Sequence, residues 1–60
     1  MVTTADIHPI RAFRLAAGFS LRALGEASGV RYTRLWQIEQ GLRASDRELQ
    51  LIAVALGIPL

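Results

Sequence analysis

Residues 20–40 read SLRALGEASGVRYTRLWQIEQ, two helix-sized stretches on either side of a glycine. Ser20 is a favourable N-cap, so a helix is predicted over residues 20–28. Gly29 then supplies the turn, because glycine adopts without steric penalty the positive φ that follows many helices. A second helix is predicted over residues 32–40. The inward faces are expected to hold Ala23, Leu24 and Ala27 in the first helix and Leu35 and Ile38 in the second.

Two short helices joined by a tight glycine turn, with an apolar residue after the glycine, form the helix-turn-helix pattern. A helix enters the major groove of DNA only if it stands clear of its domain, and the preceding helix and the turn set its angle. Ala27 and Val30 are expected to pack in the elbow, where bulk or charge would push the helices apart. The pattern therefore predicts that the second helix reads DNA.

One helix is predicted before this pair, over residues 8–17, with Asp6 as its N-cap. Pro9 is tolerated in the first turn, where its missing N–H would be unpaired anyway, and Gly18 follows the last residue. The 3.6-residue period divides the helix into two faces. The inward face is expected to hold Ile10, Phe13 and Ala17, and the outward face Arg11 and Arg14.

A fourth helix is predicted over residues 45–56. Its first residues, SDRE at 45–48, form a capping box, and Gly57 and Pro59 stop it. Strands are not expected, because no run shows sustained β-branched alternation. The fold class predicted is therefore all-α, a compact bundle of four short helices. The apolar positions of the fourth helix repeat at helical spacing: Leu49, Ile52, Ala53 and Leu56.

Length and composition limit the classes of function. The chain has 60 residues and is expected to form a single domain over residues 1–60, with residues 1–5 as a candidate flexible tail. This length excludes a two-domain enzyme with an interdomain cleft. Without cysteine and with one histidine, the chain is expected to have no disulfide and no metal site. No cofactor and no enzymatic activity are expected.

Hydropathy and charge bear on the partner. No apolar run approaches the roughly 18–20 residues of a membrane span, and the first residues do not resemble a signal peptide. A cytoplasmic protein without a membrane partner is therefore expected. All seven basic residues are arginines and the net charge is +2. Arginine suits contacts with phosphate and guanine, although coding bias in a GC-rich genome would produce the same composition.

A wider set of residues carries a family resemblance: RLAAGFS at 14–20, Leu24, Ala27, Gly29, Val30, Leu35, Ile38, Glu39 and Gly41, then Leu49, Ile52, Ala53, Leu56 and Gly57. In this order and spacing they resemble the lambda-repressor-like helix-turn-helix domains of the Cro/cI (XRE) type, over about residues 8–60. The resemblance implies double-stranded DNA as partner. It also implies a structural ion pair between Arg14 and Glu39, which as a partly exposed pair would contribute about 0–1 kcal/mol. The family often has a fifth helix, which this chain is expected to lack.

The outward face of the second helix of the pair holds the candidate base-reading side chains. In the resembled family the base-reading positions correspond to Tyr32, Thr33 and Gln37, with Trp36 next to them. Gln37 can pair bidentately with adenine, whereas Thr33 and Tyr32 can meet a thymine methyl group or a phosphate. Arg34 can reach guanine or a phosphate. Trp36 can pack on the sugar-phosphate backbone, contact a thymine methyl group or bind another protein, with the alternative that it folds down over the elbow.

Candidate phosphate contacts surround this face: Arg22, Arg31, Gln40 and Arg43. The alternative for each of these arginines is that it is only a solvated surface charge.

Three residues depart from the family pattern. Leu21 stands where the family usually has a phosphate-binding glutamine. Arg31 is a poor N-cap for the second helix of the pair. Gly25 replaces a frequent alanine inside the first helix, at a cost of roughly 0.5–1 kcal/mol.

The 52% hydrophobic content leaves apolar residues that the inward faces do not use. Leu51, Val54, Ile58 and Leu60 are expected to form a self-complementary patch for a homodimer with two-fold symmetry. Two reading helices about 34 Å apart would then read a palindrome. In the alternative, these residues cover the foot of the first helix.

Two functions follow from these observations. The favoured one is sequence-specific DNA binding by a small transcriptional regulator, a repressor acting by occupancy. Phage regulators, antitoxins and restriction-modification controllers share such a domain. The alternative is a protein-interaction module of the same fold that uses Trp36, Tyr32, Leu21 and the C-terminal apolar residues.

Overall fold

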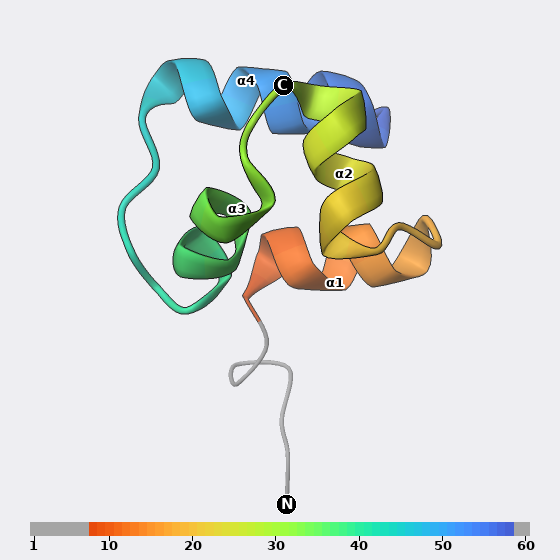
Figure 1. Ribbon diagram of the computed structural model, residues 1–60, viewed down its shortest axis with the longest axis horizontal. Coiled ribbons are helices and arrows are strands. Elements are labelled where there is room, and N and C mark those ends of the chain that lie inside the picture. The colour runs from red at the N-terminus through yellow and green to blue at the C-terminus, as the bar shows by residue number, and fades with distance from the viewer. Residues whose placement is uncertain (1–7, 59–60) are drawn as a thin grey trace, which may run out of the picture.

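The protein is all-α over residues 8–58, the part of the chain that the computed structural model describes. Its helices are α1 (Pro9–Ala16), α2 (Leu21–Ser28), α3 (Tyr32–Glu39) and α4 (Asp46–Leu56) (Figure 1). The predicted all-α bundle is confirmed, with each helix within two residues of its expected bounds. The candidate tail over residues 1–5, the proposed cap Asp6 and the apolar Leu60 lie outside the described residues.

The core lies where α2, α3 and α4 meet. Leu24 of α2, Leu35 and Ile38 of α3, and Ile52 of α4 are almost completely buried. Val30, the apolar residue of the turn, joins them in one cluster. α2 packs against both α3 and α4, and α1 packs against α3 (Figure 1). The core therefore fixes α3 from behind.

Side-chain caps set most of the helix starts. Ser20 Oγ accepts a hydrogen bond from the Ala23 N–H at 3.0 Å. Ser45 and Glu48 form the predicted capping box, each side chain accepting from the other residue's backbone N–H. No side chain caps α3 at Arg31, as its residue type led us to expect.

The cap predicted for the first helix was wrong. α1 begins at Pro9, so the capping position falls on His8 rather than Asp6. The Nδ1 atom of His8 accepts a hydrogen bond from the Ile10 N–H at 3.2 Å. A cap must directly precede the first helical turn, and Asp6 stands too far back along the chain.

Two inward faces also differ from the prediction. In α1 the buried residue is Arg14, whereas Phe13 is half exposed. In the elbow Ala27 is exposed and Ser28 is buried beside Val30. The cause in the elbow is a hydrogen bond from the Val30 N–H to Ser28 Oγ at 3.1 Å, which gives Ser28 a partner inside the turn. Helical periodicity ranks apolar side chains and does not anticipate a buried polar residue that has found its partner.

None of the four helices is long and apolar enough to cross a membrane. Within residues 8–58, His, Asp and Glu side chains do not gather in any group of three that could hold a metal ion.

Candidate nucleic-acid interface

The turn between α2 and α3 is held close to α2. Gly29 adopts φ 79°, in the left-handed region that glycine enters freely. At Gly25, inside α2, a Cβ atom would lie 3.0 Å from the Val30 carbonyl oxygen and 3.3 Å from the Tyr32 nitrogen. The glycine that weakens α2 as a helix former is therefore the residue that lets the start of α3 approach it.

A buried ion pair fixes the other end of α3. Arg14 of α1 donates from Nε and Nη2 to the Glu39 carboxylate at 2.7 and 3.0 Å. Its Nη1 donates to the Phe19 carbonyl oxygen at 2.9 Å, so all three nitrogens of the guanidinium have partners. The side chains are only 10% and 3% exposed. The expectation of a partly exposed pair was wrong, because Arg14 faces inward.

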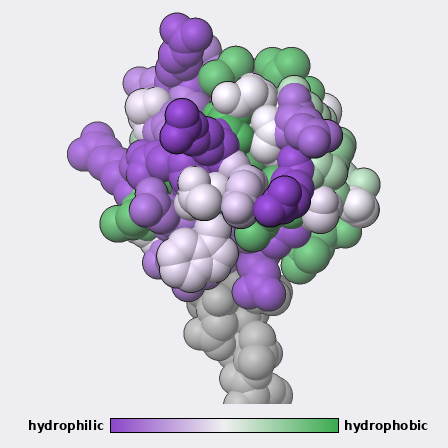
Figure 2. Space-filling model, in the orientation of Figure 1, coloured by the Kyte–Doolittle hydropathy of each residue, from purple (hydrophilic) through white to green (hydrophobic). Residues whose placement is uncertain are grey.

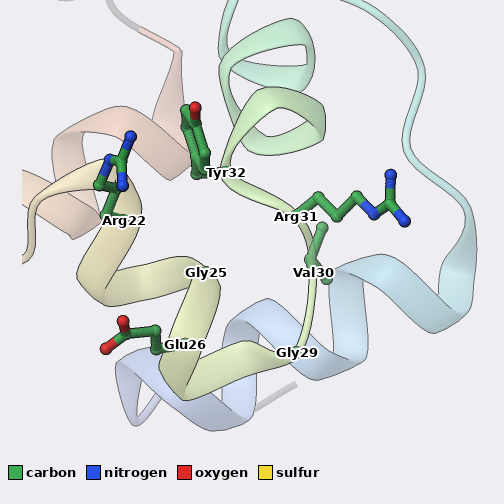
Figure 3. Close-up of a pocket in the computed structure, with 7 residues that line it drawn as sticks. All are labelled: Arg22, Gly25, Glu26, Gly29, Val30, Arg31 and Tyr32. Atoms are coloured by element: carbon green, nitrogen blue, oxygen red, sulfur yellow. The ribbon is translucent and has the colours of Figure 1, made fainter.

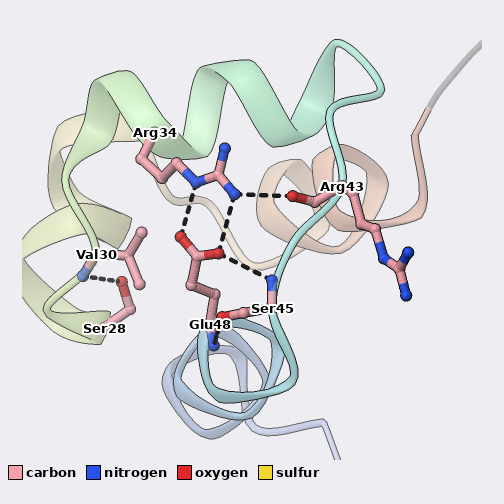
Figure 4. A network of polar contacts seen from close by, with 6 residues as sticks. All are labelled: Ser28, Val30, Arg34, Arg43, Ser45 and Glu48. Carbon is pink, nitrogen blue, oxygen red and sulfur yellow. Dashed lines mark hydrogen bonds and ion pairs between the residues drawn. The ribbon is translucent and has the colours of Figure 1, made fainter.

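A second ion pair links α3 to the start of α4. Arg34 donates from Nε and Nη2 to the Glu48 carboxylate at 2.8 and 3.1 Å, and Nη2 also donates to the Arg43 carbonyl oxygen at 2.8 Å (Figure 4). Glu48 also accepts from the Ser45 N–H at 2.9 Å. These hydrogen bonds, that from Arg34 first, lower the pKa of Glu48 from 4.5 to about 2. The same pairing raises the pKa of Arg34.

The outward face of α3 stays open between these two clamps. Tyr32 and Trp36 are 42% and 54% exposed, and Thr33 and Gln37 are exposed beside them. With more than half of its surface in solvent, Trp36 is a surface side chain and not the cover of the elbow. These four residues and Leu21 of α2 line one hollow of about 350 Å³.

A second hollow, of about 420 Å³, lies beside the turn (Figure 3). Arg22 of α2 stacks over the Tyr32 ring, 4.8 Å from its centroid, and this cation–π contact holds the ring and the guanidinium together. Arg31 lines the hollow from its far side, and Glu26 brings one negative charge to it. Figure 2 shows one face of the molecule on which hydrophilic side chains are most crowded at the upper left and reach right of centre, whereas hydrophobic ones lie mainly along the upper and right edge.

The comparison with protein families decides what this arrangement is. A helix-turn-helix family model matches residues 10–60, which include all of α2, the turn and α3. The chain belongs to that family. This helix-turn-helix domain is of the Cro/cI (XRE) type, and the family consists of DNA-binding regulators. A search of curated proteins and a search of solved structures each returned no match.

Most of the predicted base-reading residues of this helix-turn-helix domain come together. Tyr32, Thr33, Trp36 and Gln37 share the open face of α3. Arg34 does not join them, because its guanidinium is turned to Glu48. The predicted phosphate set is distributed around this face on exposed positions: Arg22 on α2, Arg31 before α3, Gln40 after it, and Arg43 on the segment leading to α4.

Sequence reasoning missed the partner of Arg34. Glu48 was recognised only as the last residue of a capping box, yet that box points its carboxylate back across the start of α4. The sequence signal was an acidic residue tied to a helix start, 14 residues after an arginine on α3. Sequence reasoning also missed the stacking of Arg22 on Tyr32, because the two residues are ten positions apart and no local pattern links them.

The predicted apolar patch for a dimer divides into two places. Leu51 and Val54, 36% and 81% exposed, line a hollow on α4 with Arg47 and Gln50. Ile58 instead lines a separate apolar hollow that includes residues of α1. The cause is the end of α4, where the Ile58 N–H donates to the Ala53 carbonyl oxygen at 2.9 Å and folds the chain back. Ile58 thus lies at the foot of α1, as the alternative interpretation had it.

Proposed function

We propose that this helix-turn-helix domain is a sequence-specific transcriptional repressor that inserts the open face of α3 into the major groove of its operator. One observation carries the proposal: α3 is held at both ends by ion pairs to α1 and α4, while its outward side chains make no contact that conceals them. A rigid helix with an open face satisfies the geometric need of groove reading. Repression then follows from occupancy, because bound protein blocks polymerase.

In this proposal Gln37 is the principal reader. Its amide NH2 group can donate to N7 of adenine while its Oε1 accepts from the N6 amino group, which makes a bidentate pair, and Thr33 beside it can reach a neighbouring base edge or phosphate. Tyr32 and Trp36 border them. Arg34 is withdrawn from the base-reading set and assigned to bracing α3 against α4, because Glu48 occupies its Nε and Nη2.

Phosphate contacts position the helix. Arg22 and Arg31 lie on either side of the hollow beside the turn, and Arg43 and Gln40 lie beyond the other end of α3. Two groups of donors separated along α3 would grip the backbone at both edges of the groove, and such contacts set register without reading sequence. Each phosphate neutralised lowers the logarithm of affinity by about 0.9 per tenfold rise in salt.

The proposed operator is a palindrome bound by a homodimer. Val54 and Leu51 form the apolar centre of the surface that we assign to the two-fold contact, with Arg47 and Gln50 at its rim. An apolar side chain as exposed as Val54 is a candidate for burial by a second copy of the domain. The two α3 helices would then lie about one turn of DNA, roughly 34 Å, apart.

The deciding experiment is selection of bound duplexes from a random library, followed by affinity measurements on the selected operator. Gln37→Ala is expected to weaken operator binding roughly 10- to 100-fold, because a bidentate base contact discriminates by about 1–3 kcal/mol. Binding to random DNA should stay unchanged. The matched control is Arg11→Ala, which removes an exposed side chain of α1 outside the interface. If no sequence motif is enriched by the wild-type domain, the proposed function is wrong.

A protein partner is the second candidate, and the exposure of Trp36 and Tyr32 favours it. Aromatic side chains are enriched in the centres of protein–protein interfaces. Salt separates the two candidates. Binding to DNA should weaken steeply between 50 and 200 mM salt, by about 10³-fold or more for six phosphate contacts, whereas apolar binding of a protein through Trp36 should change little.

A further inference from the structure

The hollow on the open face of α3 has an apolar wall where a DNA interface usually offers donors and acceptors. Leu21 of α2 and Trp36 of α3 line it, together with Tyr32. Leu21 is partly buried because it packs against the core, so its position is fixed from behind. Trp36 is 54% exposed. Gln37 and Thr33 complete the lining, which places polar readers directly beside the apolar wall.

The major groove presents few apolar groups. The edges of guanine, adenine and cytosine offer only donors and acceptors, whereas thymine carries a methyl group at C5. A C5-methyl group beside a polar base edge is therefore the chemistry that an apolar wall next to Gln37 and Thr33 can recognise. Tyr32 lines both this hollow and the one beside the turn, which Arg22 and Arg31 also line. These two arginines are proposed phosphate contacts, so the surroundings of the hollow favour a nucleic acid as occupant.

We propose that the Leu21–Trp36 hollow holds the C5-methyl group of a pyrimidine next to the base that Gln37 reads. The inference rests on the proposed DNA-reading function and adds a second specificity element to it. Trp36 supplies a flat apolar surface, and Leu21 supplies an aliphatic one at a position fixed by the core. Tyr32 supplies a third wall of the hollow, and the stacking of Arg22 on its ring holds it in place (Figure 3).

The recognised chemistry has two sources. Thymine carries the C5-methyl group always, and cytosine carries it only when methylated at C5. A hollow that contacts only the methyl group accepts both thymine and C5-methylcytosine. Affinity for a site with cytosine at that position would therefore rise when the cytosine is methylated.

The first arm of the test removes single methyl groups from DNA. Each thymine of the selected operator is replaced in turn by deoxyuridine, and the dissociation constant is measured. One thymine in each half-site is expected to show a loss of roughly three- to fivefold, the effect of one buried methyl group. The other thymines should show little change.

The second arm replaces that thymine–adenine pair by cytosine–guanine, with and without a C5-methyl group on the cytosine. Methylation is expected to restore affinity by a similar three- to fivefold factor. An effect of deoxyuridine without an effect of cytosine methylation would show that the hollow recognises thymine alone and would overturn the two-source proposal.

The variants assign the effect to the hollow. Trp36→Ala should abolish the difference between thymine and deoxyuridine while the domain stays folded, because Trp36 lies on the surface. Leu21→Ala should reduce it, and its circular dichroism melt shows whether the fold survives. The matched control is Leu15→Ala, an exposed leucine on α1 for which the difference should persist.

The results separate this inference from the proposed function. A domain that selects an operator motif but is indifferent to every deoxyuridine replacement keeps its function and loses the methyl hollow. A methyl effect that persists at full size in Trp36→Ala also overturns the assignment. If no motif is selected, the function and the inference both fail.

Discussion

Gly25 is a residue whose role the structure reverses. As a glycine in a helix it costs α2 about 0.5–1 kcal/mol relative to alanine. In the fold its missing side chain is what admits the Val30 carbonyl and the Tyr32 backbone. The close approach involves main-chain atoms, which have little freedom to move aside.

Gly25→Ala is therefore expected to destabilise the domain by about 0.5–2 kcal/mol, since an overpacking penalty of about 1–3 kcal/mol exceeds the gain in helix propensity. Urea unfolding followed by circular dichroism measures it. Ala27→Gly, on the exposed part of the same helix, is the matched control and should lose only the propensity difference. A stabilised Gly25→Ala variant would show that the turn has room for a methyl group.

Glu48 makes stability depend on pH at the residue scale. Its folded-state pKa of about 2 lies below the ordinary 4.5. Its contribution to stability is therefore complete above about pH 4.5 and is lost as the pH falls toward 2. The difference in thermal midpoint between the wild type and Glu48→Gln should be largest near pH 6 and shrink toward pH 2.

The glutamine in that variant can still accept the Ser45 N–H, so the comparison isolates the charge. Glu26→Gln, at an exposed position of α2, is the control substitution. A gap between wild type and Glu48→Gln that stays constant from pH 6 to pH 2 would show that the ion pair with Arg34 contributes nothing to stability.

At the scale of the element, α3 is defined by what holds it. Glu39 ties its last turn to α1, and Arg34 ties its first turns to α4. Leu35 and Ile38 bury the face behind. The helix α3 is thus constrained on three sides, and only its outward side chains remain free to meet a ligand.

Breaking the buried Arg14–Glu39 ion pair is expected to cost more stability than breaking the more exposed Arg34–Glu48 pair. Arg14→Met is expected to destabilise the domain by about 3–5 kcal/mol, because it leaves the Glu39 carboxylate buried without a cation. For a domain of this size that loss approaches the whole free energy of unfolding. The double variant Arg14→Met, Glu39→Leu should recover most of it, since an apolar pair leaves no buried charge.

Thermal melts of the two variants and of Glu39→Gln measure these losses. Arg11→Met is the matched control, an exposed arginine on the same helix. A loss for Arg14→Met no larger than that for Arg11→Met would mean that water reaches the pair and that the value for a surface pair applies.

At the scale of the whole molecule, the proposed homodimer depends on an exposed apolar part of α4. Val54 is 81% exposed on α4. Val54→Glu is expected to keep the fold and prevent self-association, because two-fold symmetry brings the two introduced carboxylates close together. Sedimentation at micromolar concentration should change from dimer to monomer. Affinity for a palindromic operator should fall at least about tenfold, while affinity for a single half-site stays the same.

The control for this variant is Leu15→Glu, a similar exchange on the exposed surface of α1. It should leave the oligomeric state unchanged. Wild-type protein that is monomeric both in solution and on palindromic DNA would contradict the proposed dimer.

Features set by neighbours along the chain were predictable. The capping box at Ser45 and Glu48, the N-cap Ser20 and the glycine turn at Gly29 follow from hydrogen bonds that span two to four residues. The buried pair Leu35 and Ile38 follows from helical periodicity. The open face of α3 follows in turn, because the opposite face of a short amphipathic helix is left to solvent.

Features set across the fold were not predictable in the same way. Arg14 is buried because Glu39, 25 residues away, pairs with it, and Arg34 does not join the open face of α3 because Glu48, 14 residues away, binds its guanidinium. Leu21 acquires its place beside Trp36 only when α2 and α3 pack. Local chemistry therefore specified the helices and their order, whereas packing determined which polar side chains turn inward and which stay exposed. The physical reason is that a buried charge needs its partner close in space, at a distance along the chain that no local pattern records.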